Sequence, residues 1–119
     1  MVPHRIGNRA VTQAELNQAV VALRQLPAED LALVGSRGIK IHLYPSAGLE
    51  DGLLGATTIV QEAEKLAWQP TQIRIAARAN LEGAQATGEI VQHEFGHAVA
   101  VLRAQDRSED AAEAYARRF

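Results

Sequence analysis

Residues 91–102 combine two features on one predicted helix, and this combination restricts the fold more than any other part of the chain. His93 and His97 lie four positions apart, so at about 100° per residue they share one helical face. An apolar stripe falls about 140° to 200° from His93, on the opposite face. It consists of Val91, Phe95, Ala98 and Leu102. Such a helix buries one face in a core and turns its histidines toward a cleft.

The remaining core must be thin. The chain has 119 residues, of which 47% are hydrophobic, but 22 of these are alanines and aromatic residues make up only 4%. This length predicts a single domain over 1–119, which could be the C-terminal part of a longer protein. The net charge of −2 argues against a surface for nucleic acid. No apolar run reaches the roughly 20 residues of a membrane span, so we expect no membrane insertion.

Two further helices are predicted before this region. The pattern T-x-x-E beginning at Thr12 is a capping box, which predicts a helix over 13–26. Pro27 is expected to open a second, short helix that Gly35 and Gly38 terminate.

The middle of the chain contains the strand signals. Residues 39–44 alternate apolar and polar side chains, which predicts a strand, and 45–55 reads as an irregular loop. Residues 57–69 fit either a helix or a strand, and we favour the helix. A second short strand, over 72–75, is expected to pair with the first. Together these elements predict an α+β fold with a short antiparallel sheet.

Residues 93–97 form an H-E-x-x-H sequence, with the spacing that zinc requires of two histidines on one helical face. His93 and His97 would bind Zn²⁺ as neutral imidazoles, and Glu94 would act as general base toward a water at the metal. Gly96 is unfavourable inside a helix by about 1 kcal/mol relative to alanine. It therefore indicates the close approach of another backbone, such as a strand on the substrate side.

A third metal ligand must come from outside this motif, because catalytic zinc usually has three protein ligands. In the extended H-E-x-x-H-x-x-G-x-x-H pattern, the glycine and third-histidine positions hold Ala100 and Arg103. The chain has no cysteine, so a carboxylate is the natural choice. A new helix with Ser108 as N-cap is predicted at the C-terminus, and it offers Glu109, Asp110 and Glu113.

The sequence HEFGHAV at 93–99, followed by E-x-x-A-E-A-aromatic at 109–115, resembles the catalytic domain of anthrax lethal factor and related bacterial toxin metallopeptidases. The resemblance extends over 93–119 and implies a minimal zincin-like domain with a gluzincin site. It also implies that Glu109 is the third zinc ligand and that Glu113 orients a ligand histidine.

Helix geometry keeps Glu113 open as an alternative third ligand. If the metal helix runs to about Ala104 and the chain turns tightly at Asp106, Glu109 lies opposite residue 102 or so. At 1.5 Å per residue this is several ångströms along the axis from His97, and Glu113 would lie nearer the metal.

The resemblance further implies a tyrosine just before the glutamate, which helps to stabilise the oxyanion. The corresponding stretch, 102–108, has none. The substitutes for this oxyanion or substrate contact are Tyr115, Tyr44 and His42.

These features predict a zinc-dependent metalloendopeptidase that hydrolyses peptide bonds of a protein target. The resemblance implies a bacterial toxin or effector domain, secreted or delivered into a target cell as part of a larger effector, with a cognate immunity protein as partner. One alternative is a housekeeping or phage-derived regulatory metallopeptidase. Another is a catalytically inactive zincin-like binding module.

Overall fold

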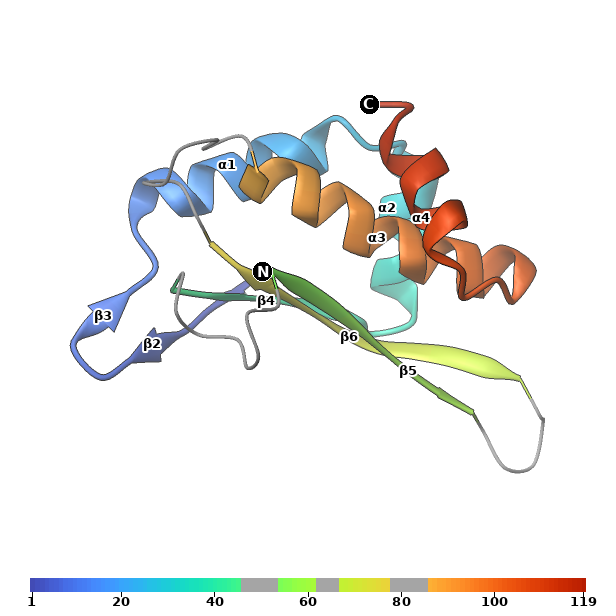
Figure 1. Ribbon diagram of the computed structural model, residues 1–119, viewed down its shortest axis with the longest axis horizontal. Coiled ribbons are helices and arrows are strands. Elements are labelled where there is room, and N and C mark those ends of the chain that lie inside the picture. Colours follow the sequence, from blue (N-terminus) through green and yellow to red (C-terminus); the bar gives the residue numbers. More distant parts are fainter. Residues whose placement is uncertain (46–53, 62–66, 78–85) are drawn as a thin grey trace.

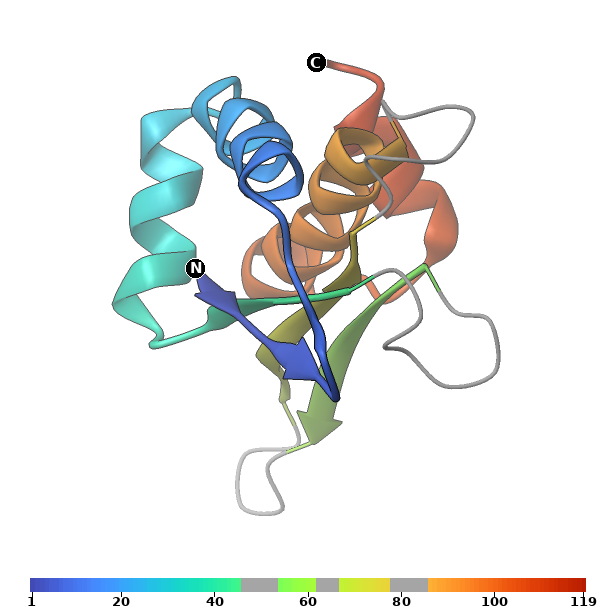
Figure 2. The ribbon, with the colours of Figure 1, turned by 90° about the vertical axis from the view of Figure 1, so that its left-hand side faces the viewer.

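The protein is described by a computed structural model that covers residues 1–45, 54–61, 67–77 and 86–119. In this part of the chain the helices lie together on one face of a four-stranded sheet, so the fold has two layers (Figure 1). Figure 2, viewed from the side, shows the sheet beneath the helices. The predicted α+β class is confirmed.

The helical layer contains four helices, each in a region that the sequence predicts as helical. Its elements are α1 (Gln13–Arg24), α2 (Ala28–Ser36), α3 (Ala86–Ala104) and α4 (Glu109–Ala116). The capping box at α1 is formed, since the Thr12 hydroxyl accepts from the Glu15 N–H at 3.1 Å and Glu15 Oε1 accepts from the Thr12 N–H at 2.9 Å. Ser108 caps α4 as expected, accepting from the Ala111 N–H at 3.1 Å.

The sheet has the strand order β1-β4-β6-β5. Its strands are β1 (Val2–Pro3), β4 (Lys40–Tyr44), β5 (Gly55–Gln61) and β6 (Trp68–Ala76), while β2 (Arg5–Ile6) and β3 (Arg9–Ala10) form a separate antiparallel ribbon. The sheet is mixed, because β4 pairs in parallel with β1 and β6, and β5 is antiparallel to β6.

The predicted pairing of the two central strands is correct, but their predicted antiparallel orientation is wrong. Ile41 is opposite Ile73, and Leu43 is opposite Ile75, in a parallel register. The reason is that the chain runs backward through β5 before it enters β6. It therefore passes β4 and β6 in the same direction.

The helix favoured over 57–69 is also wrong, since residues 55–61 form strand β5 and 68–76 form β6. Thr57, Thr58, Ile59 and Val60 are β-branched, and such residues pack well on a pleated sheet. Gly55, expected in the preceding loop, begins β5. Residues 46–53 of that loop, 62–66, and 78–85 before α3 lie outside the described residues.

The core lies between the sheet and α3. Ile41, Leu43, Ile73 and Ile75 face the helices, because all four are buried whereas the alternate residues of β4 are only half-buried or exposed. On α3, the predicted stripe residues Val91, Phe95 and Ala98 are fully buried, and Leu102 packs partly against the core. This burial fixes the orientation of α3, and therefore the direction in which its opposite face, with His93 and His97, points. No helix among the described residues is long and apolar enough to cross a membrane.

Candidate metal centre

Helix α3 presents three polar side chains toward the edge strand β5 and toward α4. The imidazole rings of His93 and His97 lie 5.0 Å apart between centroids, nearly perpendicular at 83°. His97 and Glu94 are buried, with exposed fractions of 6% and 7%, while His93 is half-buried. Potential ligand atoms of these three residues lie within 4.8 Å of one another. The predicted clustering on one helical face is therefore present.

Glu109 reaches both histidines from the first turn of α4. Its Oε2 atom lies 2.8 Å from His93 Nε2, and its Oε1 atom lies 3.1 Å from His97 Nε2. Partial desolvation raises the pKa of Glu109, but the hydrogen bond with His93 and the nearby His97 outweigh it, so the pKa lies below its ordinary value. The lowered pKa favours the ionised carboxylate, which is the form that ligates a metal.

The short connection between His97 and Glu109 is possible because α4 folds back closely over α3. A Cβ atom at Gly96 would lie 3.0 Å from Tyr115 Cβ and 3.1 Å from the Ala112 carbonyl oxygen. The expected close approach at Gly96 is therefore confirmed, but the approaching backbone is that of α4 rather than of a substrate-side strand. Although α3 does run to Ala104, this crossing brings Glu109 level with the histidines.

Glu113 occupies a different position from the one that helix geometry alone suggested. Its Oε2 atom accepts from Arg117 Nη2 at 3.3 Å, one turn along α4. Its side chain lines the cavity next to His93, but the histidine contacts of α4 come from Glu109. Among the glutamates of α4, the structure brings Glu109 rather than Glu113 to the two imidazoles.

Glu94 is held by the edge strand β5. The Thr57 hydroxyl lies 3.0 Å from Glu94 Oε1 and 2.9 Å from the Glu94 carbonyl oxygen. A Cβ atom at Gly55 would lie 2.8 Å from Glu94 Cγ, so β5 packs directly on this side chain. Burial raises the pKa of Glu94 above its ordinary value, and the hydrogen bond from Thr57 and the nearby histidines offset part of the rise.

Thr57 and Gly55 were missed by the sequence interpretation. Their role depends on residues 55–61 forming a strand beside α3, whereas the sequence patterns favour a loop over 45–55 followed by a helix over 57–69. The β-branched run 57–60 was the signal that could have placed a strand there.

The three residues considered for oxyanion contact lie elsewhere. Tyr115 is buried behind α3, where its hydroxyl donates to Asp30 Oδ2 at 2.8 Å. Burial and this carboxylate strongly raise the pKa of Tyr115.

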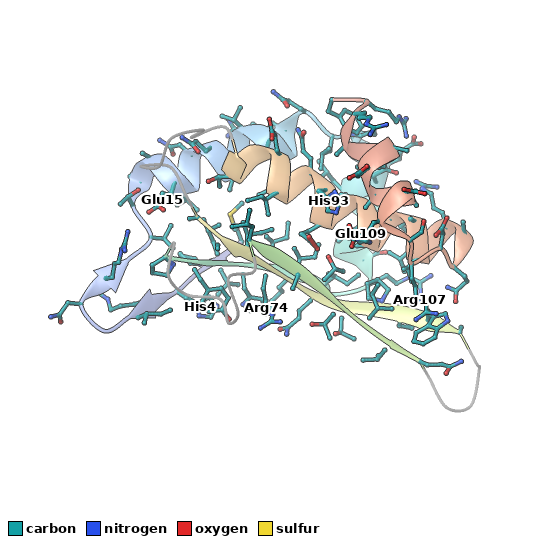
Figure 3. The ribbon with its side chains drawn as sticks, in the orientation of Figure 1. His4, Glu15, Arg74, His93, Arg107 and Glu109 are labelled. Atoms are coloured by element: carbon teal, nitrogen blue, oxygen red, sulfur yellow. The ribbon has the colours of Figure 1, made fainter. Side chains whose placement is uncertain are left out.

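Tyr44 and His42 alternate along β4 with the buried Ile41 and Leu43, so they occupy the sheet face opposite the helices. There the His4 ring stacks on Tyr44 at 4.2 Å, and His4 Nε2 lies 2.8 Å from His42 Nδ1. Figure 3 shows His4 on this lower side of the sheet and His93 on the upper side. The structure thus brings none of the three oxyanion candidates to the histidine pair.

Two cavities flank the His93–Glu94–His97 cluster and share Gly55, Glu94 and Glu109 as lining residues. The larger, of about 750 Å³, extends along α4 toward Phe119. The smaller, of about 390 Å³, lies between His97, β5 and Arg107. The His93–Glu94–His97 cluster therefore lies between two cavities that are accessible to a ligand.

The donor set fits a zinc ion. Two imidazole nitrogens and one carboxylate are a common three-residue set for catalytic zinc. His97 Nδ1 is buried without a hydrogen-bond partner in the described part of the chain. A neutral His97 that coordinates through Nε2 carries its proton on Nδ1, where ligand histidines usually donate to an acceptor. The ligand types thus match, whereas this supporting hydrogen bond is missing from the described residues.

Comparisons with known proteins provide no relative: no protein-family model, no curated protein and no solved structure matches the chain.

Proposed function

We propose that this domain is a zinc-dependent metalloendopeptidase with a minimal zincin-like fold, in which His93, His97 and Glu109 hold Zn²⁺. The observation that carries the proposal is the contact of one Glu109 carboxylate with Nε2 of both histidines of the H-E-x-x-H helix. The Glu109 side chain is largely exposed to solvent. Two imidazoles and a carboxylate converge beside a cleft. This position favours a ligand-binding role over a purely structural hydrogen-bond network in the core.

When bound, zinc supplies a Lewis acid that acidifies water and polarises a carbonyl. The two histidines bind it as neutral imidazoles, and Glu109 contributes the negative charge. Glu94 accepts a proton from the attacking water and passes it to the leaving amine. Its burial raises its pKa above the ordinary value of a glutamate, which makes it a stronger proton acceptor.

The substrate is an extended peptide that binds along β5. Within the described parts of the chain this strand is an edge of the sheet, because it pairs there with β6 alone. Edge strands present unpaired N–H and C=O groups, to which an extended peptide can add as a further strand. Thr57 and Gly55 of β5 touch Glu94, so a peptide on this edge would lie beside the general base.

The resemblance of 93–99 and 109–115 to anthrax lethal factor and related toxin metallopeptidases supports a more specific assignment. On this basis we assign the domain to a bacterial toxin or effector that acts on a protein of the target cell. Its producer would then require an immunity protein. A housekeeping or phage-derived regulatory peptidase would use the same residues, and an identified substrate would separate the two.

The test is a cleavage screen of the purified zinc-loaded chain on a proteome-derived peptide mixture. We expect cleavage that chelator abolishes and zinc restores, and that Glu94→Gln abolishes while zinc content stays at one ion per chain. Glu113→Gln is the matched control on the same cleft and should retain cleavage. Persistent cleavage by Glu94→Gln would overturn the mechanism.

A zincin-like binding module is the second candidate, because none of the three tyrosine and histidine candidates for the oxyanion lies at the site. Such a module would bind zinc for stability only. It would cleave nothing in the screen, and chelation would lower only its melting temperature.

A further inference from the structure

Arg107 lies flat on an aromatic ring at the rim of the smaller cavity. Its guanidinium carbon is 3.7 Å from the centroid of the Trp68 ring. Trp68 begins β6, whereas Arg107 belongs to the connection between α3 and α4. Figure 3 shows Glu109 between His93 and Arg107, so the stacked arginine lies beyond the metal cluster in the direction of the hairpin of β5 and β6.

Gln105 holds the residue on which Arg107 stacks, which is Trp68. Its Oε1 atom accepts from the Trp68 N–H at 2.6 Å, and its Nε2 atom donates to the Trp68 carbonyl at 3.0 Å and to the Val101 carbonyl at 2.9 Å. Gln105 also has a positive φ of 56°, a conformation that most residues avoid. These bonds tie the start of β6 to the end of α3 and fix the backbone of Trp68, the residue on whose ring Arg107 stacks.

The charge of Arg107 is not neutralised by any carboxylate of the described residues. The nearby acids are engaged elsewhere: Glu109 with the two histidines, and Asp106 with the Ser108 N–H at 2.8 Å. Arg103, by contrast, pairs with Asp30 at 2.6 Å. Among the described residues that line the smaller cavity, Arg107 is the only lysine or arginine.

Stacking uses the face of the guanidinium and leaves its N–H edge available. That edge is a planar fork of donors that matches a carboxylate in bidentate fashion. A dianionic phosphate is less suitable here, because Glu94 and Glu109 line the same cavity and would repel it more strongly.

We propose that Arg107, stacked on Trp68, selects peptide substrates by binding a carboxylate close to the scissile bond. The carboxylate is either an aspartate or glutamate side chain or the free C-terminus of the peptide. Arg107 is therefore a specificity-determining residue of the cleft. This inference rests on the proposed peptidase function for its substrate class, but the binding step can be measured without cleavage.

The binding test uses the full zinc-loaded chain carrying Glu94→Gln, so that no turnover occurs. Three probes are titrated: acetyl-Ala-Ala-Glu-Ala-Ala-amide, its Gln counterpart as amide, and the Gln peptide with a free C-terminal carboxylate. Trp68 is the sole tryptophan of the chain, so its fluorescence reports binding at the stack, and calorimetry provides the dissociation constants.

We expect the Glu peptide or the free-carboxylate peptide to bind roughly tenfold more tightly than the neutral amide, as one charge-assisted bidentate contact provides. The probe that gains affinity identifies the source of the carboxylate. Arg107→Gln should abolish the difference, and Arg107→Lys should retain part of it. Arg37→Gln, at an exposed arginine that lines neither cavity, is the control and should change nothing. Equal affinities for all three probes, or an unchanged preference in Arg107→Gln, would overturn the proposal.

Cleavage measurements separate this inference from the proposed function. If the chain with intact Glu94 cleaves peptides without preference for a carboxylate, the assignment of Arg107 fails and the peptidase function stands. If no peptide is cleaved but the carboxylate preference depends on Arg107, the peptidase function fails and the binding site stands.

Discussion

Gly96 of α3 and Tyr115 of α4 lie so close together that a Cβ atom at position 96 would be 3.0 Å from Tyr115 Cβ. The contact determines where Glu109 lies, because Glu109 and Tyr115 belong to the same short helix. The glycine is unfavourable for helix stability, but it allows α4 to cross α3 at the histidines.

Gly96→Ala should therefore displace α4 and weaken zinc binding. Overpacking of this kind destabilises by about 1–3 kcal/mol, more than the roughly 1 kcal/mol that alanine gains in helix propensity. Zinc affinity by competition titration and stability by urea unfolding should both fall.

Gly35→Ala is the matched control for this substitution, because a Cβ atom there meets nothing within 4 Å and Gly35 is also in a helix. It should leave zinc affinity unchanged and stabilise slightly. Unchanged zinc affinity in Gly96→Ala would refute the role of the crossing.

Glu109→Ala should lower zinc affinity by more than about 100-fold, because even the partners of ligand residues typically account for 10- to 100-fold. Glu113→Ala should have a small effect, since its carboxylate pairs with Arg117. Metal-competition titrations of both variants test this. The opposite order of effects would make Glu113 the ligand.

Thr57→Val should lower kcat by about 10- to 150-fold with little change in KM. The hydroxyl hydrogen-bonds Glu94 Oε1 at 3.0 Å, and losing a hydrogen bond to a charged group is equivalent to about 1.5–3 kcal/mol. Thr57→Ser retains the hydroxyl and should restore most of the rate. If valine and serine lower kcat equally, the effect comes from packing rather than from orientation of the general base.

Tyr115→Phe should destabilise the domain by about 1.5–3 kcal/mol, because the hydroxyl donates to the buried Asp30 carboxylate. Its kcat on a cleaved peptide should stay close to that of the original chain. Urea unfolding and steady-state kinetics measure the two effects separately. A large loss of kcat without loss of stability would indicate that the Tyr115 hydroxyl contacts substrate after all.

The titration of His42 should make the fold less stable at mildly acidic pH. Burial and the neighbouring His4, Lys40 and N-terminus lower the pKa of His42 from its ordinary 6.5, and Arg74 is its register partner on β6. Well above pH 6.5 His42 is neutral in both the folded and the unfolded state. As pH falls below this value the unfolded chain takes up the proton more readily, so the free energy of unfolding decreases until the folded-state pKa is passed.

Thermal unfolding of the original chain and of His42→Gln between pH 5 and 8 tests this relationship. The difference between the two curves isolates His42 from other titrating groups, including Glu94. A difference that does not vary with pH would contradict the prediction.

Local sequence determined the helices of this protein and two of the proposed metal ligands. The capping box at Thr12, the N-cap at Ser108 and the apolar stripe of α3 act over three to eleven residues, within or just beside one element. The spacing of His93 and His97 needs only a helical turn between them. Such short-range patterns can be read from the sequence because the regular helix itself fixes how residues a turn apart are arranged.

Tertiary structure decided between the helix and the strand that local sequence left open at 57–61, and it alone decided the parallel pairing of β4 with β6 and the choice of Glu109 over Glu113 as the partner of the histidines. Thr57 and Glu94 are 37 residues apart, and the direction of β6 depends on how the intervening strand turns back. These outcomes depend on which elements bury their faces against each other. In particular, the packing of α4 on Gly96, rather than the spacing along the chain, brings Glu109 to His93 and His97.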